Sequence, residues 1–432
     1  MSIAFSLLLV SIAAAPALIA FDGLAAQSLI EILAVTALAF VAVTARTADV
    51  HFAAHATRRL RLAAAVPAVW MVVQILPMPI PALSHSIWTN ANEALNQQAY
   101  GHISIDIGKS IEALIFYAAN IALIVAGMFV FKDRRRAELV LSILAAITAL
   151  TTIALVILKF LPNRRIGVAE ITEILAAVSS LGIILSMAAG ARAIERRESR
   201  NAGLDGEAPN ARSTLILTGI ELLVCIAGLA FSATLNVGLV VAFGMITFGS
   251  IQIIRRLGLA GWAIVVFMAT LVIAALMVIF WRYDPSSSLT PLLQFATAAP
   301  ADSISLAQRM LFDTNWLGTG AGTYMPLLPI YQHLGSLVAG PPSTASALVV
   351  ELGRLAAAFV LIFSLGIVAT LYLGALNRGR DSCYAAAAAA CIIVLLGEAF
   401  CDASLQHSCV AVLGDIVIGL GLAQRFGSGT AA

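Results

Sequence analysis

Long apolar runs recur along the whole chain, and each is close to the roughly 20 residues that a membrane-spanning helix needs. Polar and charged residues gather in the segments between these runs. The runs predict spanning helices over residues 3–21, 24–44, 62–80, 111–131, 139–158, 171–191, 214–233, 237–254, 259–281, 344–375, 383–400 and 408–424. The run 344–375 is long, and we expect it to begin outside the hydrocarbon. The pattern predicts an all-α, polytopic membrane helix bundle of about twelve transmembrane helices.

Composition agrees with this pattern. Hydrophobic residues make up 61% of the chain and charged residues only 11%, whereas a soluble domain carries about 25% charged residues. No Lys or Arg precedes the first apolar run, so we expect a retained helix there rather than a signal peptide. No further domain is evident, and residues 1–432 are interpreted as a single integral membrane domain.

Basic residues are sorted by side. Most of the 25 Lys and Arg residues lie in one set of alternate loops: Arg46, Arg58, Arg59, Arg61, Lys132, Arg134, Arg135, Arg136, Arg192, Arg196, Arg197, Arg200, Arg212, Arg255, Arg256, Arg378, Arg380 and Arg425. Such loops are usually cytoplasmic. Both termini are therefore expected in the cytoplasm, and residues 282–343 are expected to form a large periplasmic loop. A long ordered loop is usually functional.

That loop contains "QRMLFDTNWLGTGAGTYMP", in which Gly318, Gly320 and Gly322 alternate with other residues. A dinucleotide fingerprint needs its third glycine at Thr323 or Met325, and a phosphate-binding P-loop needs a Lys that is missing here. The loop is also expected on the side where nucleotides are scarce. We exclude a nucleotide-binding loop and expect no nucleic-acid partner.

The segment before the glycines predicts a short amphipathic helix over 302–314 at the membrane surface. Its apolar residues, Ile304, Leu306, Ala307, Met310 and Leu311, follow helical spacing. Asp302 or Ser303 can cap its start. Arg309 then has two interpretations: an ion pair with Asp313 one turn later, or a guanidinium that binds phosphate oxygens in a membrane-proximal cavity.

At these residues the chain resembles the O-antigen ligase and polymerase family. Members have about twelve spans and a late periplasmic loop with an arginine, a tryptophan, a "GxGxGxF/Y" turn and a following "ELG". Here "RMLFDTNWLGTGAGTY" and "PPSTASALVVELGRLA" stand in those places, and ten residues separate Arg309 from Gly320. The stretches "WMVVQILPMPIPALSHSIW" and "LLGEAFCDASLQHSCVAVLGDIVIGLGLA" are also similar.

Two departures bear on which reaction the resemblance implies. Ligases of this family carry a His-Asn pair about nine residues before the "ELG" glutamate, where this chain has Pro342 and Ser343. In the third outer loop, neither Arg164 nor Arg165 is followed by a glycine at the spacing of the polymerases. The missing histidine favours a polymerase, and a divergent ligase stays open.

The resemblance implies a metal-independent glycosyltransferase of the bacterial inner membrane. Its donor is a glycan on undecaprenyl pyrophosphate, its acceptor is a glycan or lipid hydroxyl, and it needs no cofactor. Fixed arginines in a low-dielectric site suit the charge that grows on the leaving pyrophosphate. The candidate catalytic residues are Arg309, Arg165, Arg164 and, as the base, Glu351. The candidate substrate-binding residues are Gly318, Gly320, Gly322, Tyr324, Arg354, His333 and Arg282.

Several of these residues also have a structural interpretation. Arg282 follows Trp281 and is typical of an interfacial anchor, and Arg354 could form an intrahelical pair with Glu351. No metal site is expected, because the six histidines lack acidic or cysteine partners at ligand spacing. A disulfide between Cys401 and Cys409 is chemically permitted. A twelve-helix secondary transporter is the rival class, although the loop after the second span lacks the "GxxxDRxxRR" pattern of such carriers.

Overall fold

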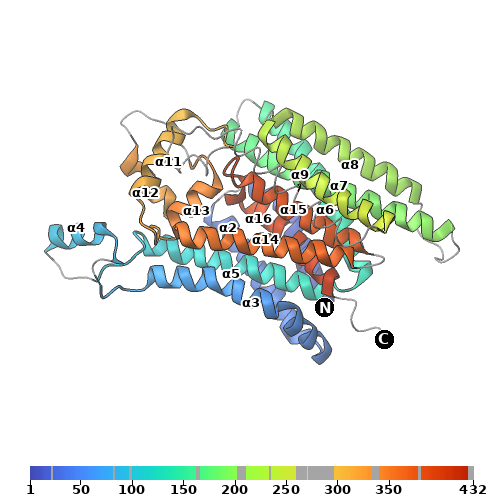
Figure 1. Ribbon diagram of the computed structural model, residues 1–432, viewed down its shortest axis with the longest axis horizontal. Helices are drawn as coiled ribbons and strands as arrows, with labels where there is room; N and C mark the ends of the chain where they lie inside the picture. The colour runs from blue at the N-terminus through green and yellow to red at the C-terminus, as the bar shows by residue number, and fades with distance from the viewer. Residues whose placement is uncertain are drawn as a thin grey trace.

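The long helices run side by side in one bundle (Figure 1). The computed structural model describes the chain except for residues 21–22, 81–82, 97–99, 162–165, 202–210, 233–234, 259–269, 271–295, 333–339, 378–380 and 427–432. The described helices are α1 (Ser2–Ala20), α2 (Leu24–Thr44), α3 (Thr47–Ile75), α4 (Ser86–Leu95), α5 (Ile107–Val130), α6 (Arg134–Phe160), α7 (Val168–Asn201), α8 (Ala211–Ser232), α9 (Leu235–Leu257), α11 (Ala301–Asp313), α12 (Tyr324–Tyr331), α13 (Thr344–Leu352), α14 (Arg354–Leu376), α15 (Ser382–Glu398), η3 (Ser404–Gln406) and α16 (Ser408–Phe426). The predicted all-α class is confirmed for these residues.

Nine of the described helices are long and apolar enough to cross a membrane: α1, α2, α5, α6, α7, α8, α9, α14 and α16. The last part of α3, Ala64–Ile75, and the whole of α15 are shorter apolar helices. The protein is therefore a multi-pass membrane protein. The predicted span 259–281 lies outside the described residues except for Thr270.

The predicted span 62–80 starts close to the apolar part of α3, Ala64–Ile75, but extends too far at its end. Helix α3 already begins at Thr47 and stops at Ile75. The stop has a local cause, because Pro77 has no N–H to donate and disfavours helical backbone in the residue before it. The chain leaves the helix there, and the N–H of Met78 donates to the carbonyl of Gly101 instead.

The predicted single span 344–375 is two helices. Helix α13 ends at Leu352, and α14 begins at Arg354. Gly353 between them has φ +85° and ψ 164°, a left-handed conformation that side chains disfavour. The periodicity of the apolar residues continues through the break, so the sequence pattern did not reveal it.

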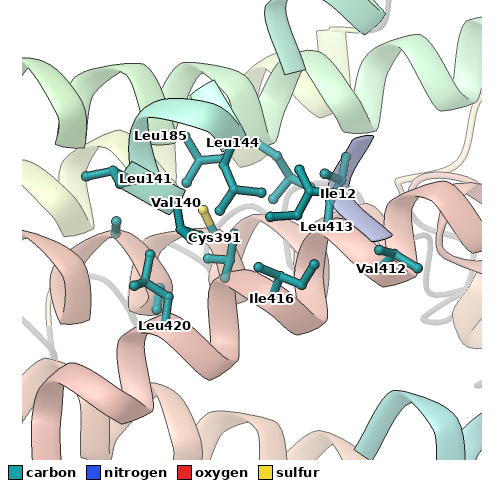
Figure 2. Packing of buried hydrophobic residues seen from close by; sticks show 14 of the residues in the cluster. Ile12, Val140, Leu141, Leu144, Leu185, Cys391, Val412, Leu413, Ile416 and Leu420 are labelled. Carbon is teal, nitrogen blue, oxygen red and sulfur yellow. The ribbon is translucent and has the colours of Figure 1, made fainter. Parts of the chain in front are cut away.

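The core is built around α15, which packs against α7, α9, α14 and α16. Its residues from Ser382 to Ile392 are all buried, including the alanine run 385–390. Small side chains let helices approach closely, and a Cβ atom on Gly421 of α16 would lie 2.2 Å from that of Ala388. Figure 2 shows leucine and isoleucine side chains of the neighbouring helices gathered around Cys391 of α15.

Ion pairs join the helices at one end of the bundle, which we call the basic end. Arg192 is 3% exposed and its guanidinium lies 2.9 Å from the carboxylate of Asp381 and 3.2 Å from that of Glu195. Arg134 also pairs with Asp381, at 3.1 Å, and Arg196 pairs with Glu138. Basic residues from separate loops thus meet at the same end, as the sidedness of the sequence predicts.

Helices α4, α11, α12 and α13 lie at the opposite end, which we call the far end (Figure 1). This places the described part of the predicted large loop away from the basic end. The two ends are therefore expected to face different compartments.

We expect a cysteine at Ser305 of α11 to react with a membrane-impermeant thiol reagent in intact cells. A cysteine at Thr47 should react only after the membrane is permeabilised, because Thr47 lies near Thr44 at the basic end, where the Thr44 hydroxyl accepts a hydrogen bond from the amino terminus. The five native cysteines are buried and provide a low background. The opposite labelling pattern would reverse the predicted orientation.

Candidate active site at the glycine turn

A tight turn of alternating glycines connects α11 to α12 at the far end. Gly318, Gly320 and Gly322 have φ values of +81°, +109° and +74°. All three conformations are disfavoured for residues with a Cβ atom. The alternation of glycines in the sequence therefore serves the backbone path, and we call residues 314–323 the glycine turn.

The glycine turn packs directly on the break between α13 and α14. The N–H groups of Thr319 and Gly320 donate to the carbonyls of Val350 and Glu351, at 2.9 Å and 3.0 Å. A Cβ on Gly318 would lie 2.3 Å from the Glu351 carbonyl, and one on Gly353 would lie 2.2 Å from the Trp316 carbonyl. The two backbones thus touch with no room for a side chain between them.

Gln74, in the last turn of α3, connects both sides of this contact. Its side chain is fully buried. Its Nε2 donates to the carbonyls of Leu317 and Glu351, at 3.0 Å and 2.9 Å. Its Oε1 accepts from the N–H of Ala321 at 3.2 Å. One amide group thereby satisfies carbonyls that α13 and the glycine turn leave without helical partners.

The segment before α5 also contacts the glycine turn. Ser104 is fully buried, and its hydroxyl lies 2.7 Å from that of Ser110, which donates to the carbonyl of Ala321 at 2.9 Å. The Trp70 indole donates to the carbonyl of Leu352 at 2.8 Å. Three distant segments therefore hold the glycine turn: the α13–α14 break, the end of α3 and the start of α5.

Glu351 is the acidic group of this site. Its Oε1 accepts from the N–H of Tyr324, the first residue of α12, at 3.2 Å, and Gly322 supplies a second backbone N–H. Burial raises the pKa of Glu351 to about 7, against the lowering effect of these two N–H groups. A carboxyl with such a pKa can take up or release a proton near neutral pH, as a general base must.

Tyr324 lies beside this carboxyl and is 1% exposed. Burial and the nearby charge of Glu351 raise the pKa of its phenol. Its hydroxyl finds no hydrogen-bond partner among the described residues. Buried hydroxyl groups usually have such a partner, so the Tyr324 hydroxyl is available to a ligand group or a water molecule.

Arg354 begins α14 immediately after the break. Its guanidinium donates to the carbonyl of Leu311 at 3.3 Å and lies 5.3 Å from the centre of the Trp316 ring. The described side chains form no intrahelical ion pair between Arg354 and Glu351, because Gly353 separates the two helices. Arg354 instead connects α14 to the end of α11.

Arg309 lies on the exposed face of α11. The opposite face is buried, as the amphipathic pattern predicts, through Ser303, Leu306, Ala307, Met310 and Leu311. The helix begins earlier than expected: Pro300 is its N-cap, and neither Asp302 nor Ser303 caps it with a side chain. Asp313, the suggested partner of Arg309, accepts a hydrogen bond from Tyr331.

The structure thus brings together Glu351, Tyr324, Arg354 and the three glycines, with Arg309 on the adjoining helix. Arg164, Arg165, Arg282 and His333 lie outside the described residues. Their predicted roles stay predictions.

Sequence reasoning missed Gln74, Ser104, Ser110 and Trp70. Gln74 had a detectable signal, since it is the single amide within the apolar stretch "WMVVQILPM", and a polar residue inside a span is rarely there by chance. The two serines carried no such signal, because serine is common at the start of any helix.

The described cysteines and acidic residues form neither a disulfide nor a group of metal ligands. All five cysteines are free, so the suggested disulfide between Cys401 and Cys409 is not formed. Among the described residues, no three His, Cys, Asp or Glu side chains are grouped so that they could hold a metal ion.

Comparison of the chain with models of protein families and with curated proteins gives no match.

Gly318→Ala should lower the free energy of unfolding by more than about 2 kcal/mol, because it forces a left-handed residue and a clash with the Glu351 carbonyl. Gly238→Ala is the matched control: Gly238 lies in α9, and a Cβ added there would have nothing within 4 Å, so alanine should stabilise that helix by up to about 1 kcal/mol. Denaturant titration in mixed micelles measures both. Equal effects would contradict the described turn.

Gln74→Leu should lower the free energy of unfolding by about 2–4 kcal/mol, because the Leu317 carbonyl and the Ala321 N–H lose their side-chain partner, while the Glu351 carbonyl keeps only the N–H of Gly320. Gln252→Leu provides a second glutamine within a helix, and the Nε2 of Gln252 has no hydrogen-bond partner in the described part of the chain. That control should be neutral or slightly stabilising in the same titration. A neutral Gln74→Leu would show that the amide does not hold the turn.

Proposed function

We propose that this protein transfers or polymerises a glycan carried on polyprenyl pyrophosphate, at the outer face of the bacterial inner membrane. The observation that carries the proposal is the position of Glu351 and Arg354 on the two sides of a helix break, with Arg309 on α11, whose end Arg354 contacts. A carboxyl and a guanidinium on the two sides of one helix break, with a second guanidinium on α11, suit a reaction that moves a proton and releases a diphosphate.

The proposed reaction assigns a role to each of these groups. The acceptor hydroxyl oxygen bonds to the anomeric carbon of the donor sugar, and the bond from that carbon to the phosphate oxygen breaks. The proton of the hydroxyl passes to the Glu351 carboxylate. Arg309 and Arg354 stabilise the charge on the departing polyprenyl diphosphate, because a planar guanidinium can bind two phosphate oxygens at once.

The position of the site supports this assignment. It lies at the far end, away from the Arg192 network of the basic end, and a lipid-linked donor of this class is used on the side opposite the cytoplasm. The pKa of Glu351, raised to about 7, fits a base that must be partly ionised at neutral pH. The glycan polymerase is the preferred reaction, because the chain lacks the ligase histidine before Glu351.

A broken helix in a membrane bundle is also a feature of secondary transporters, which bind substrate at such breaks. The α13–α14 break therefore keeps the transporter as a second candidate. The ligase differs from the polymerase only in its acceptor.

Deletion of the gene separates the three candidates by the surface glycans that remain. Loss of a polymerase should leave glycans of a single repeat, whereas loss of a ligase should leave long polymer on the polyprenyl carrier. Loss of a transporter should leave glycan length unchanged. Gel analysis of surface and lipid-linked glycans distinguishes these outcomes.

Arg309→Lys and Arg354→Lys should each reduce polymer formation at least about 10-fold in the complemented strain, because lysine keeps the charge but loses the planar fork. Arg256→Lys, at the basic end, is the control and should restore glycan of normal length. Normal glycan in the two lysine variants and in Arg309→Ala would remove these arginines from the reaction.

A further inference from the structure

The glycine turn lies beside the start of a spanning helix. The N–H of Ile105, just before α5, donates to the carbonyl of Thr319 at 3.0 Å, and the Ser110 hydroxyl donates to the carbonyl of Ala321 at 2.9 Å. A Cβ on Gly322 would lie 3.4 Å from that of Ala113. Helix α5 begins at Ile107, so Ala113 is roughly 9 Å along it at 1.5 Å per residue. The turn therefore extends from the end of a candidate membrane span to the depth of its second turn.

The backbone of the turn is suited to that depth. Irregular backbone is tolerated inside a membrane only where protein groups satisfy its N–H and C=O groups. Gln74 and Ser110 satisfy three such groups of the turn, at Leu317 and Ala321. Within the turn, the hydroxyl of Thr323 donates to the carbonyl of Gly320 at 2.6 Å. None of these bonds needs water.

Large apolar side chains face outward next to the turn. Phe312 is 82% exposed, Trp316 61% and Leu355 67%. Arg354 joins the segments that carry them, because it bonds to the carbonyl of Leu311, next to Phe312, and stacks on Trp316. Below Leu355, the exposed stripe of α14 continues through Ile362 and Leu365, which are 68% and 50% exposed. The patch is thus continuous with the outward face of a spanning helix.

The outward face of α11 changes character along its length. Its exposed residues include Asp302, Ser305, Arg309 and then Phe312. Ser305 and Phe312 are seven residues apart, so they lie on the same face of the helix about two turns from one another. The face is polar at its start and carries the apolar Phe312 near its end, beside the exposed Asp313, with Arg309 one turn earlier.

We propose that this patch contacts the acyl chains of the outer leaflet. Phe312, Trp316 and Leu355 face the acyl chains, and Arg309 and Arg354 lie at the level of the lipid phosphates. The α11 face crosses the boundary between water and hydrocarbon between Ser305 and Phe312. Arginine and tryptophan are typical of that boundary, where the guanidinium reaches the phosphates and the ring lies among the headgroups. The proposal does not depend on the glycan chemistry.

Site-specific fluorescence quenching tests the proposal in the full chain. Single cysteines at Ser305, Phe312, Leu355 and Ile362, all exposed positions, are labelled with a small fluorophore, and the protein is reconstituted into phosphatidylcholine vesicles. Labelling of the unsubstituted chain measures the background from its five buried cysteines. Each sample is quenched by iodide in the water or by phosphatidylcholine with a nitroxide near the top or the middle of its acyl chain.

The label at Ser305 should be quenched by iodide and hardly by either lipid. At Phe312 and Leu355, we expect the shallow nitroxide to quench at least threefold more strongly than iodide. At Ile362 the nitroxide at mid-chain should quench best, which sets the depth scale. Iodide quenching at Phe312 equal to that at Ser305 would place the patch in water and overturn the proposal. Protection of Phe312 and Leu355 from both kinds of quencher would show that protein covers the patch, which also overturns it.

Discussion

The direct contact between two backbones at Gly318 and Gly353 is the constraint on which the far end depends. Each glycine has a positive φ, and a Cβ added to either would lie 2.3 Å or 2.2 Å from a backbone carbonyl oxygen. No side chain fits between the two backbones. The backbone N–H and C=O groups that do not pair across the contact therefore need partners from neighbouring segments. Gln74 and Ser110 do this, and Trp70 adds a bond to the carbonyl at the end of α13.

The same contact places the chemical groups. The break after Leu352 turns Glu351 toward the first N–H groups of α12 and turns Arg354 toward α11. In one continuous helix these side chains would be a turn apart and could neutralise each other. Their separation leaves a carboxyl whose pKa is about 7 and a guanidinium on an aromatic ring. In the proposed reaction one of these groups takes the proton and the other binds the phosphate, and the same backbone contacts hold both in place.

Much of the fold followed from the sequence, because each lipid-facing helix needs a long apolar run. The boundaries of α1, α2 and α8 fall within a few residues of the expected ones. The break at Gly353 could not be predicted from the sequence, since a glycine is tolerated within a helix. Only the contact of Gly353 with Trp316 shows that the chain must turn there. For the site, the glycines, Glu351 and Tyr324 were identified from a motif. The role of Gln74 required knowing which helix end lies beside the turn.

Helix α15 has a consequence for how the protein enters the membrane. Its alanine run is buried against other helices, so its side chains do not face lipid. Alanine contributes little to insertion compared with leucine or isoleucine, whose burial at the centre of a membrane is favourable by about 0.3–0.6 kcal/mol each. We therefore expect α15 to be a poor insertion signal by itself. The more apolar α14 before it would then impose its place across the membrane during synthesis, so a helix enclosed by protein depends on a neighbour for its topology.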